Sequence, residues 1–166
     1  MSDVEEHRLR APANLVSPRA KGLWALRAGL GWLVVLVGQA VPLVLSAAAR
    51  PWLVATLAAT AVLGVAHTAV MPWWRYRVHR WETTADAVFT RAGWATQEWR
   101  LAPVSRVQTV DTARGPLQQL FGLATVTVTT ASAQGPVTIE GLDEAVAARI
   151  VDELTATTQA TRGDAT

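Results

Sequence analysis

The sequence contains no cysteine and little charge. Without cysteine, the chain has no disulfide framework, no thiolate nucleophile and no cysteine-ligated metal site. Charged residues make up only 17% of its 166 positions, against about 25% in a typical soluble domain. The net charge of +2 is too small for the strongly basic surface of a nucleic-acid-binding domain, so we expect no nucleic-acid partner. Hydrophobic residues make up 51%, an excess that must be concentrated in part of the chain.

A catalytic motif is also lacking. His7, His67 and His79 are far apart in the sequence, and there is no HExxH motif or phosphate-binding glycine loop. No nucleophile lies beside a base in a known pattern. We therefore expect a protein that is not an enzyme and that uses no metal or cofactor.

Two long apolar segments account for the hydrophobic excess. Residues 28–49 contain no charged residue, and after a break at Arg50-Pro51 a second uncharged segment covers residues 52–71. A helix needs about 20 apolar residues to cross the ~30 Å hydrocarbon layer of a membrane. The sequence thus predicts a two-helix transmembrane hairpin within residues 23–74. A signal peptide cleaved after residues 46–49 is the alternative for the first segment, but its apolar part would exceed the usual length of about 7–15 residues.

Basic residues near these segments predict their orientation. Three lie within ten residues before the first span and three within ten residues after the second, whereas Arg50 is the single basic residue between the spans. Because basic residues are retained on the cytoplasmic side, we expect both termini at the cytoplasmic face of the plasma (inner) membrane, with residues 1–22 as a flexible tail. Five tryptophans near the predicted span ends are expected in the headgroup layers: Trp24, Trp32, Trp52, Trp73 and Trp74.

Polar and small residues within the spans predict helix contacts. Gln39 lies near mid-membrane, where its amide needs a partner, and Thr60 lies at the same depth in an antiparallel hairpin. Small residues recur every four positions in the second span, at Thr56, Thr60, Gly64 and Thr68. Such stripes let membrane helices approach closely, so we expect packing against the first span or against a neighbouring subunit.

After Trp74 the sequence changes to short alternating segments, which are typical of strands. The predicted strands cover residues 75–83, 87–90, 94–101, 106–112, 125–130 and 137–140. Apolar residues then recur at helical spacing over residues 143–154. This order predicts an α+β domain over residues 75–154, a bent antiparallel sheet or barrel capped by a C-terminal helix. Residues 155–166 are expected to form a disordered tail.

The segments Pro103–Asp111 and Gly115–Val126 are the most distinctive motifs of this domain. Their order and spacing, with Gly93 in an earlier turn and Gly141 before the last helix, resemble the bacterial PH-domain family of YdbS-like membrane proteins. The likeness covers about residues 74–154, and the preceding hairpin also matches how these proteins are built. It implies a PH-like fold. The motif positions are Gly93, Arg106, Gln108, Asp111, Gly115, Leu117, Gly122 and Gly141.

We interpret these motif residues as structural rather than ligand-binding. The four glycines lie at element junctions, where a positive φ lets the chain turn sharply. One helical turn is predicted at residues 116–121, with Pro116 at its start. Apolar side chains around it are expected to plug one end of the sheet: Leu117, Leu120, Phe121 and Leu123.

The juxtamembrane arginines are the main charge feature of the domain. Basic residues near a membrane gain about 1 kcal/mol each from anionic lipid. Arg75, Arg77 and Arg80 are therefore expected either to contact lipid headgroups or only to fix the topology.

The resemblance implies a non-catalytic scaffold or binding module at the cytoplasmic face of the membrane. Membrane lipids and either a second copy or a related membrane PH-domain protein are the partners that it suggests, with a role in envelope stress or antimicrobial resistance. The alternatives are a module that senses anionic lipid and an accessory subunit of a membrane transporter or protease complex.

Overall fold

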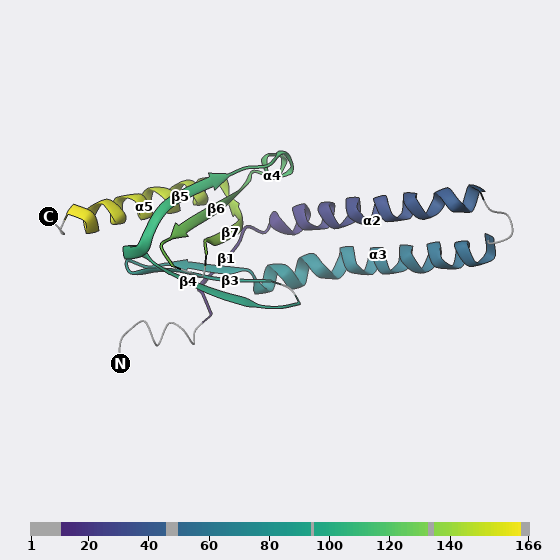
Figure 1. Cartoon of the computed structure of the whole chain (residues 1–166), viewed down its shortest axis with the longest axis horizontal. Helices are drawn as coiled ribbons and strands as arrows, with labels where there is room; N and C mark the ends of the chain where they lie inside the picture. Colours follow the sequence, from purple (N-terminus) through teal and green to yellow (C-terminus); the bar gives the residue numbers. More distant parts are fainter. Residues whose placement is uncertain (1–10, 46–49, 94, 133–134, 164–166) are drawn as a thin grey trace.

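The computed structural model describes residues 11–45, 50–93, 95–132 and 135–163 of the chain. Two long helices, α2 (Ala20–Leu45) and α3 (Arg50–Val78), lie side by side and extend away from a domain of strands and helices (Figure 1). Both helices are long and apolar enough to cross a membrane. Pro51 lies in the first turn of α3, where its missing N–H has no intrahelical partner to lose. Pro42 and Pro72 lie inside α2 and α3, and transmembrane helices tolerate proline in such positions.

The strands form two antiparallel sheets. The first has the order β1-β2-β3-β4 and the second β5-β6-β7. Their bounds are β1 Asn14–Leu15, β2 Arg80–Thr83, β3 Ala87–Ala92, β4 Glu98–Pro103, β5 Val107–Ala113, β6 Leu123–Thr130 and β7 Val137–Asp143. A 3-10 turn, η1 (Val104–Arg106), joins the sheets, and the short helix α4 (Pro116–Leu120) lies between β5 and β6. The sheets do not close into a barrel.

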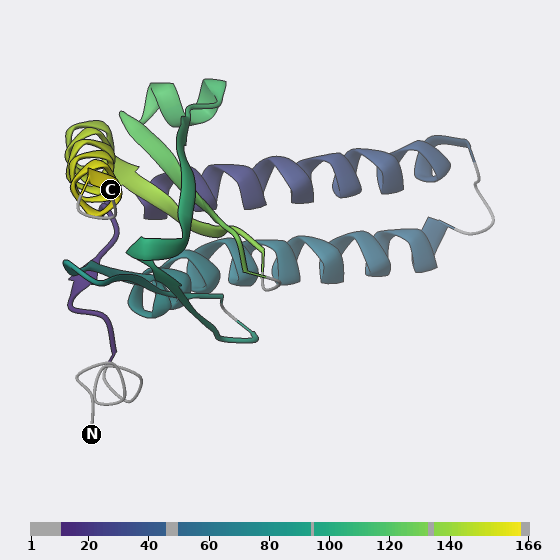
Figure 2. The same ribbon diagram turned by 60° about the vertical axis from the view of Figure 1, so that its left-hand side comes forward.

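The final helix, α5 (Glu144–Gly163), packs against the second sheet and caps it (Figure 2). The larger core lies between the sheets and this helix, with Val88, Val126, Ile139, Leu142 and Ile150 among its buried side chains. A helical hairpin followed by a PH-like α+β domain is therefore confirmed.

A second, smaller core lies where the helices meet the domain, and we refer to it as the junction core. It consists of Val16, Ala20, Leu23, Trp24 and Leu123, each at most 4% exposed. Three of these residues belong to the first turns of α2, and Leu123 begins β6. The start of α2 is therefore part of the domain core as well as part of the apolar hairpin.

Several element boundaries differ from the sequence predictions because of this junction. The segment predicted as a flexible tail contains β1, which pairs with β2, and the first residues of α2; residues 1–10 lie outside the described residues. Residues 75–78, predicted as part of a strand, form the last turn of α3 instead. Arg75 and Arg77 suit that place, because cations stabilise the C-terminal end of a helix.

The C-terminal helix is also longer than predicted. It continues beyond Leu154 to Gly163, through the segment expected to be a disordered tail. Within this extension the hydroxyls of Thr157 and Thr158 donate to carbonyls of the preceding turn, those of Glu153 and Leu154, so both side chains are satisfied within the helix.

Three of the four motif glycines have the positive φ that the sequence predicts: Gly93 (113°), Gly122 (64°) and Gly141 (75°). Gly115 differs, with φ −74°, because it is the N-cap of α4, a position with extended backbone. The plug prediction holds for Leu123, which is fully buried, and in part for Leu117 and Phe121. It is wrong for Leu120, which is 75% exposed.

Candidate functional site

The two long helices pack through the polar and small residues near their middle. The Gln39 Nε2 atom donates to Thr60 Oγ1 at 3.0 Å, the pair that the sequence predicts. Gly64 faces Trp32 so closely that a Cβ there would lie 3.1 Å from the indole ring, and Trp32 Nε1 donates to His67 Nδ1. These contacts favour packing within the hairpin.

Thr56 does not share this face. It is exposed, and its hydroxyl donates to the Leu53 carbonyl of its own helix. The reason is geometric: positions four apart drift around a helix of 3.6 residues per turn, so a stripe spread over three turns leaves the contact line. Thr68, at the other end of the stripe, is half-buried.

Replacing Gln39 with leucine is expected to weaken helix packing without preventing membrane insertion. Interhelical hydrogen bonds of this kind contribute roughly 0.6 kcal/mol, and up to about 2. The loss should fall toward the lower figure, because Gln39 Oε1 has no partner among the described residues and leucine removes that acceptor too. Thermal unfolding in detergent measures the change. Thr60→Val breaks the same bond, so the double variant should cost less than the two single losses added together, and additive losses would contradict the pairing.

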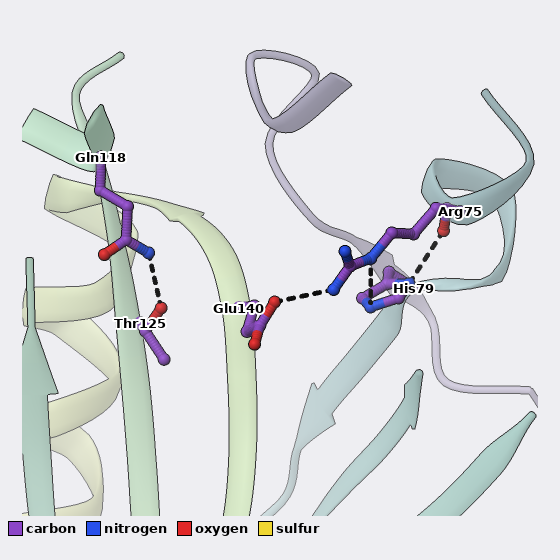
Figure 3. Close-up of polar contacts among 5 residues, drawn as sticks. All are labelled: Arg75, His79, Gln118, Thr125 and Glu140. Carbon is purple, nitrogen blue, oxygen red and sulfur yellow. Dashed lines mark hydrogen bonds and ion pairs between the residues drawn. The ribbon is translucent and has the colours of Figure 1, made fainter. Parts of the chain in front are cut away.

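At the domain end of the helices, four side chains from three segments form a polar and aromatic cluster. The Arg75 Nη2 atom, on the last turns of α3, donates to Glu140 Oε2 on β7 at 2.9 Å (Figure 3). The guanidinium also lies over the Trp24 ring of α2, 4.5 Å from its centroid. Arg75 therefore contacts both α2 and the second sheet, and it ties the hairpin to the domain.

His79 lies directly beneath Arg75 and is 5% exposed. Its Nδ1 is 2.9 Å from the Arg75 carbonyl, and its Nε2 is 3.4 Å from Arg75 Nε (Figure 3). The neutral ring with a proton on Nδ1 satisfies both contacts, whereas a second proton on Nε2 would face a cation. Burial lowers the pKa of His79 below 6.5, and the charge of Arg75 lowers it further, against smaller opposing effects of the Arg75 carbonyl and Glu140.

Stability is therefore expected to fall as the pH drops below about 6.5, because the unfolded chain binds a proton at His79 that the folded chain resists. The stability that the neutral His79 contributes is fully present above the pKa of the unfolded chain. It is lost as the pH falls toward the lowered pKa of His79 in the folded chain. The loss is limited to about 1.4 kcal/mol per pH unit for a single group. Thermal unfolding of the full chain and of His79→Gln between pH 7 and pH 5 checks this: the variant should show the shallower dependence, and equal slopes would contradict it.

A cavity of about 650 Å³ opens beside this cluster, between the β3–β4 hairpin and β7. Its wall carries two ion pairs, Arg75–Glu140 and Arg100–Glu98, the second at 3.3 Å. Hydroxyl groups complete the polar lining: those of Thr90, Thr96 and Thr138. Because each arginine is already paired with a carboxylate, the wall offers hydrogen bonding and balanced charge rather than a concentrated positive field.

The three juxtamembrane arginines have different surroundings. Arg75 is paired with Glu140, and Arg80 Nη1 lies 3.4 Å from the Pro12 carbonyl and 3.5 Å from that of Ala13. Arg77 is exposed. Of the three, Arg77 is thus best placed for the predicted lipid contact, whereas Arg75 and Arg80 hold parts of the domain together.

The remaining motif residues lie on or near α4 and β5, away from the cavity. Arg106 is exposed at the end of η1, and Gln108 and Asp111 are exposed on β5, where Asp111 accepts a hydrogen bond from Thr109. Leu117 is half-buried beside the junction core. The position of Leu117 fits the structural interpretation of the motif, which stays a prediction for the three exposed polar residues.

Sequence reasoning missed the residues that connect the hairpin to the domain. Trp24 was predicted to lie in the headgroup layer but is 1% exposed within the junction core. Its neighbour His79 and the Arg75 partner Glu140 are each more than 50 positions away in the sequence from the residue that they contact. Gln118 was also missed: it accepts from the Gly115 N–H and donates to Thr125 Oγ1 at 2.7 Å (Figure 3). The glutamine three residues after the N-cap is a capping signal that could have identified it.

Among the described residues, no three histidine, aspartate or glutamate side chains gather in a group that could hold a metal ion. The candidate functional features of the described residues are therefore the cavity with paired charges and the junction core beside it. Both belong to the half of the domain that faces the hairpin.

Comparisons with known proteins agree with this architecture. The model of the family described as "Bacterial PH domain" matches residues 26–158. The "UPF0699 transmembrane protein YdbS" of Bacillus subtilis (strain 168) is 28% identical over 129 residues, which cover 73% of this chain and 78% of that protein. No solved structure matches the chain. With two apolar helices leading into this fold and a family match over most of its length, the chain is a membrane protein that belongs to the bacterial PH domain family.

Proposed function

We propose that this protein is a non-catalytic binding module, held at the cytoplasmic face of the membrane by two transmembrane helices, that positions a protein partner close to the bilayer. The observation that carries the proposal is the junction core. Trp24 of α2 is buried in the domain, and Arg75 of α3 is paired with Glu140 of β7. A flexible tether would only raise local concentration. A fixed junction also sets which face of the domain looks toward the membrane.

The charge distribution supports the cytoplasmic orientation. Basic residues at the domain end of the two helices include Arg19, Lys21, Arg27 and Arg77, whereas Arg50 begins α3 at the opposite end. The ammonium of Lys21 lies 4.2 Å from the Trp73 ring centroid and 4.7 Å from that of Tyr76. Basic and aromatic residues together at one end of a hairpin are typical of a cytoplasmic membrane boundary.

The cavity beside Arg75 is the surface that we propose for the partner. It is polar, it opens between the two sheets, and its charges are paired, so a partner with hydrogen-bonding groups fits it better than a polyanion. The partner is a second protein of the same membrane, either another copy or a related PH-domain protein. An accessory role in a larger complex would bring a different protein to the same place.

Photo-crosslinking in native membranes tests this function. Pro136→Cys places a reactive group on the exposed rim of the cavity, and Ser105→Cys places one on η1, outside it. The full chain carrying benzophenone at position 136 should crosslink to a defined protein that mass spectrometry identifies, and the label at position 105 should not. Crosslinks that are the same at both positions, or none at position 136, would contradict the proposal.

Sensing of anionic lipid is the second candidate, and the exposure of Arg77 and of Arg19, whose side chain is 67% exposed, favours it. Each such residue would contribute about 1 kcal/mol on an anionic surface. If this candidate holds, the conformation of the reconstituted chain, followed by a fluorescent label at position 136, changes with the fraction of anionic lipid. The change should disappear in Arg77→Gln, and a signal independent of lipid charge would remove the candidate.

A further inference from the structure

Leu120 is exposed in a way that the fold of the domain does not explain. Among the described residues outside α2 and α3, the exposed large apolar side chains are Leu15, Trp99 and Leu120, and Leu120 is the most exposed at 75%. The exposed fraction of Leu120 is close to those of Val44 (79%) and Leu45 (80%), which lie in the apolar part of α2. A single exposed leucine is normal on a protein surface, but Leu120 lies beside the apolar helices.

The short helix α4 holds Leu120 in a defined place. Gln118, which is buried, donates to Thr125 on β6 and accepts from Gly115, so α4 is fixed to the sheet. On its other side, Phe121 lies against α2: a Cβ at Gly22 would be 2.8 Å from the Phe121 ring. Leu120 is therefore carried beside the first turns of α2.

That place lies at the outer edge of the headgroup layer. The uncharged segment of α2 begins at residue 28, and six residues of helix after Gly22 rise about 9 Å. The polar layer on each side of the hydrocarbon is roughly 5–8 Å thick, so α4 lies next to it and its outward side chain can reach it.

The β3–β4 hairpin lies at a similar level on the other side of the helix pair. In both views its turn points in the same direction as α2 and α3, with α4 beside α2 and the β3–β4 hairpin beside α3 (Figures 1 and 2). Trp99, near this turn, is 50% exposed, and the guanidinium of Arg91 lies 5.1 Å from its ring centroid. A tryptophan with an adjacent arginine is well suited to a membrane interface.

We propose that the domain rests on the bilayer surface through these two points, with Leu120 of α4 and Trp99 of β4 in the headgroup layer on opposite sides of the hairpin. The occupant that covers these apolar side chains is the lipid in which the chain's own helices lie, because Trp73 (61% exposed) and Trp74 (50% exposed) present exposed aromatic rings at the same end of α3. The contact is independent of whether the cavity binds a protein.

The absence of cysteine makes a site-specific test direct. Leu120→Cys and Trp99→Cys, each labelled with an environment-sensitive fluorophore, are reconstituted as full chains into vesicles of phosphatidylethanolamine and phosphatidylglycerol. Ser105→Cys is the control away from the membrane, and Val34→Cys, in the apolar part of α2, is the control within it. Lipids that carry a nitroxide near the headgroup serve as the quencher.

We expect blue-shifted emission and at least about twofold quenching at positions 120 and 99, and little of either at position 105. Emission at either position that matches the position 105 control would overturn the proposal. Blue-shifted emission without quenching by lipid would mean that protein covers the site, for example a second copy, and would overturn it as well.

Discussion

Replacing Trp24 with alanine is expected to lower the stability of the folded chain by about 3–5 kcal/mol, the usual cost of removing a fully buried large aromatic side chain. Trp24 is 1% exposed, and its ring contacts the Arg75 guanidinium and lies 5.0 Å from the His79 ring. Its loss opens a cavity in the junction core and leaves the cation without its aromatic neighbour. Thermal unfolding in detergent, followed by circular dichroism, should show a lower Tm.

Trp73→Ala is the matched control for this prediction. Trp73 lies at the same end of the hairpin but is 61% exposed and touches Lys21, so its truncation removes only a surface contact. Its effect on the Tm should be much smaller. If the two variants lost similar stability, Trp24 would be an interfacial residue, as its sequence position suggests, and the junction core would not hold the domain.

Introducing alanine at Gly141 is expected to cost about 2–5 kcal/mol, since two penalties act at this position. Its φ of 75° costs a residue with a Cβ roughly 1–2 kcal/mol. In addition, the new Cβ would lie 2.9 Å from the Cβ of Ala20, and overpacking of this kind costs about 1–3 kcal/mol. Because Ala20 belongs to α2, the strain falls on the contact between helix and domain.

Gly135→Ala separates the two penalties at Gly141. Gly135 has nearly the same φ, 77°, but a Cβ there would have no atom within 4 Å. The stability of this control should therefore fall only by the backbone penalty of a positive φ, roughly 1–2 kcal/mol. Equal unfolding temperatures for the two variants would show that the close approach of α2 to β7 does not contribute to stability.

Features that depend on local pattern could be predicted from the sequence. The two long helices cover the predicted apolar segments as far as these are described, residues 46–49 lying outside the described residues. The turn of helix follows Pro116 and the amphipathic helix follows Asp143, although that helix continues beyond its predicted end at Leu154. The pair Gln39–Thr60 could be predicted too, because an antiparallel hairpin with a short connection fixes which residues share a depth.

Features that depend on contacts between distant segments could not be predicted from the sequence. Trp24 follows charged residues and precedes an apolar run, the usual signature of an interfacial tryptophan, and no local signal shows that β6 and β7 cover it. Arg75 appears in the sequence as one of several juxtamembrane cations, yet its partner Glu140 is 65 positions away. The short strand β1 exists because β2 offers it an edge.

These contacts give the family fold a specific arrangement in this chain. The start of α2 and the end of α3 serve both as the ends of the membrane hairpin and as walls of the domain. Consequently the cavity beside Arg75, α4 and the β3–β4 hairpin all have fixed positions relative to the two helices. The proposed recruitment of a partner and the proposed contact with lipid both depend on that fixed geometry.

The rigidity of the junction is the central claim, and a distance distribution across it is the most direct test. Nitroxide labels at Ser105→Cys, on η1, and Val62→Cys, on the exposed face of α3, would report the position of the domain relative to the hairpin in reconstituted membranes. We predict a single narrow distribution by double electron–electron resonance, which broadens in Trp24→Ala. A broad distribution in the otherwise unchanged chain would show a domain on a flexible tether and would contradict the account.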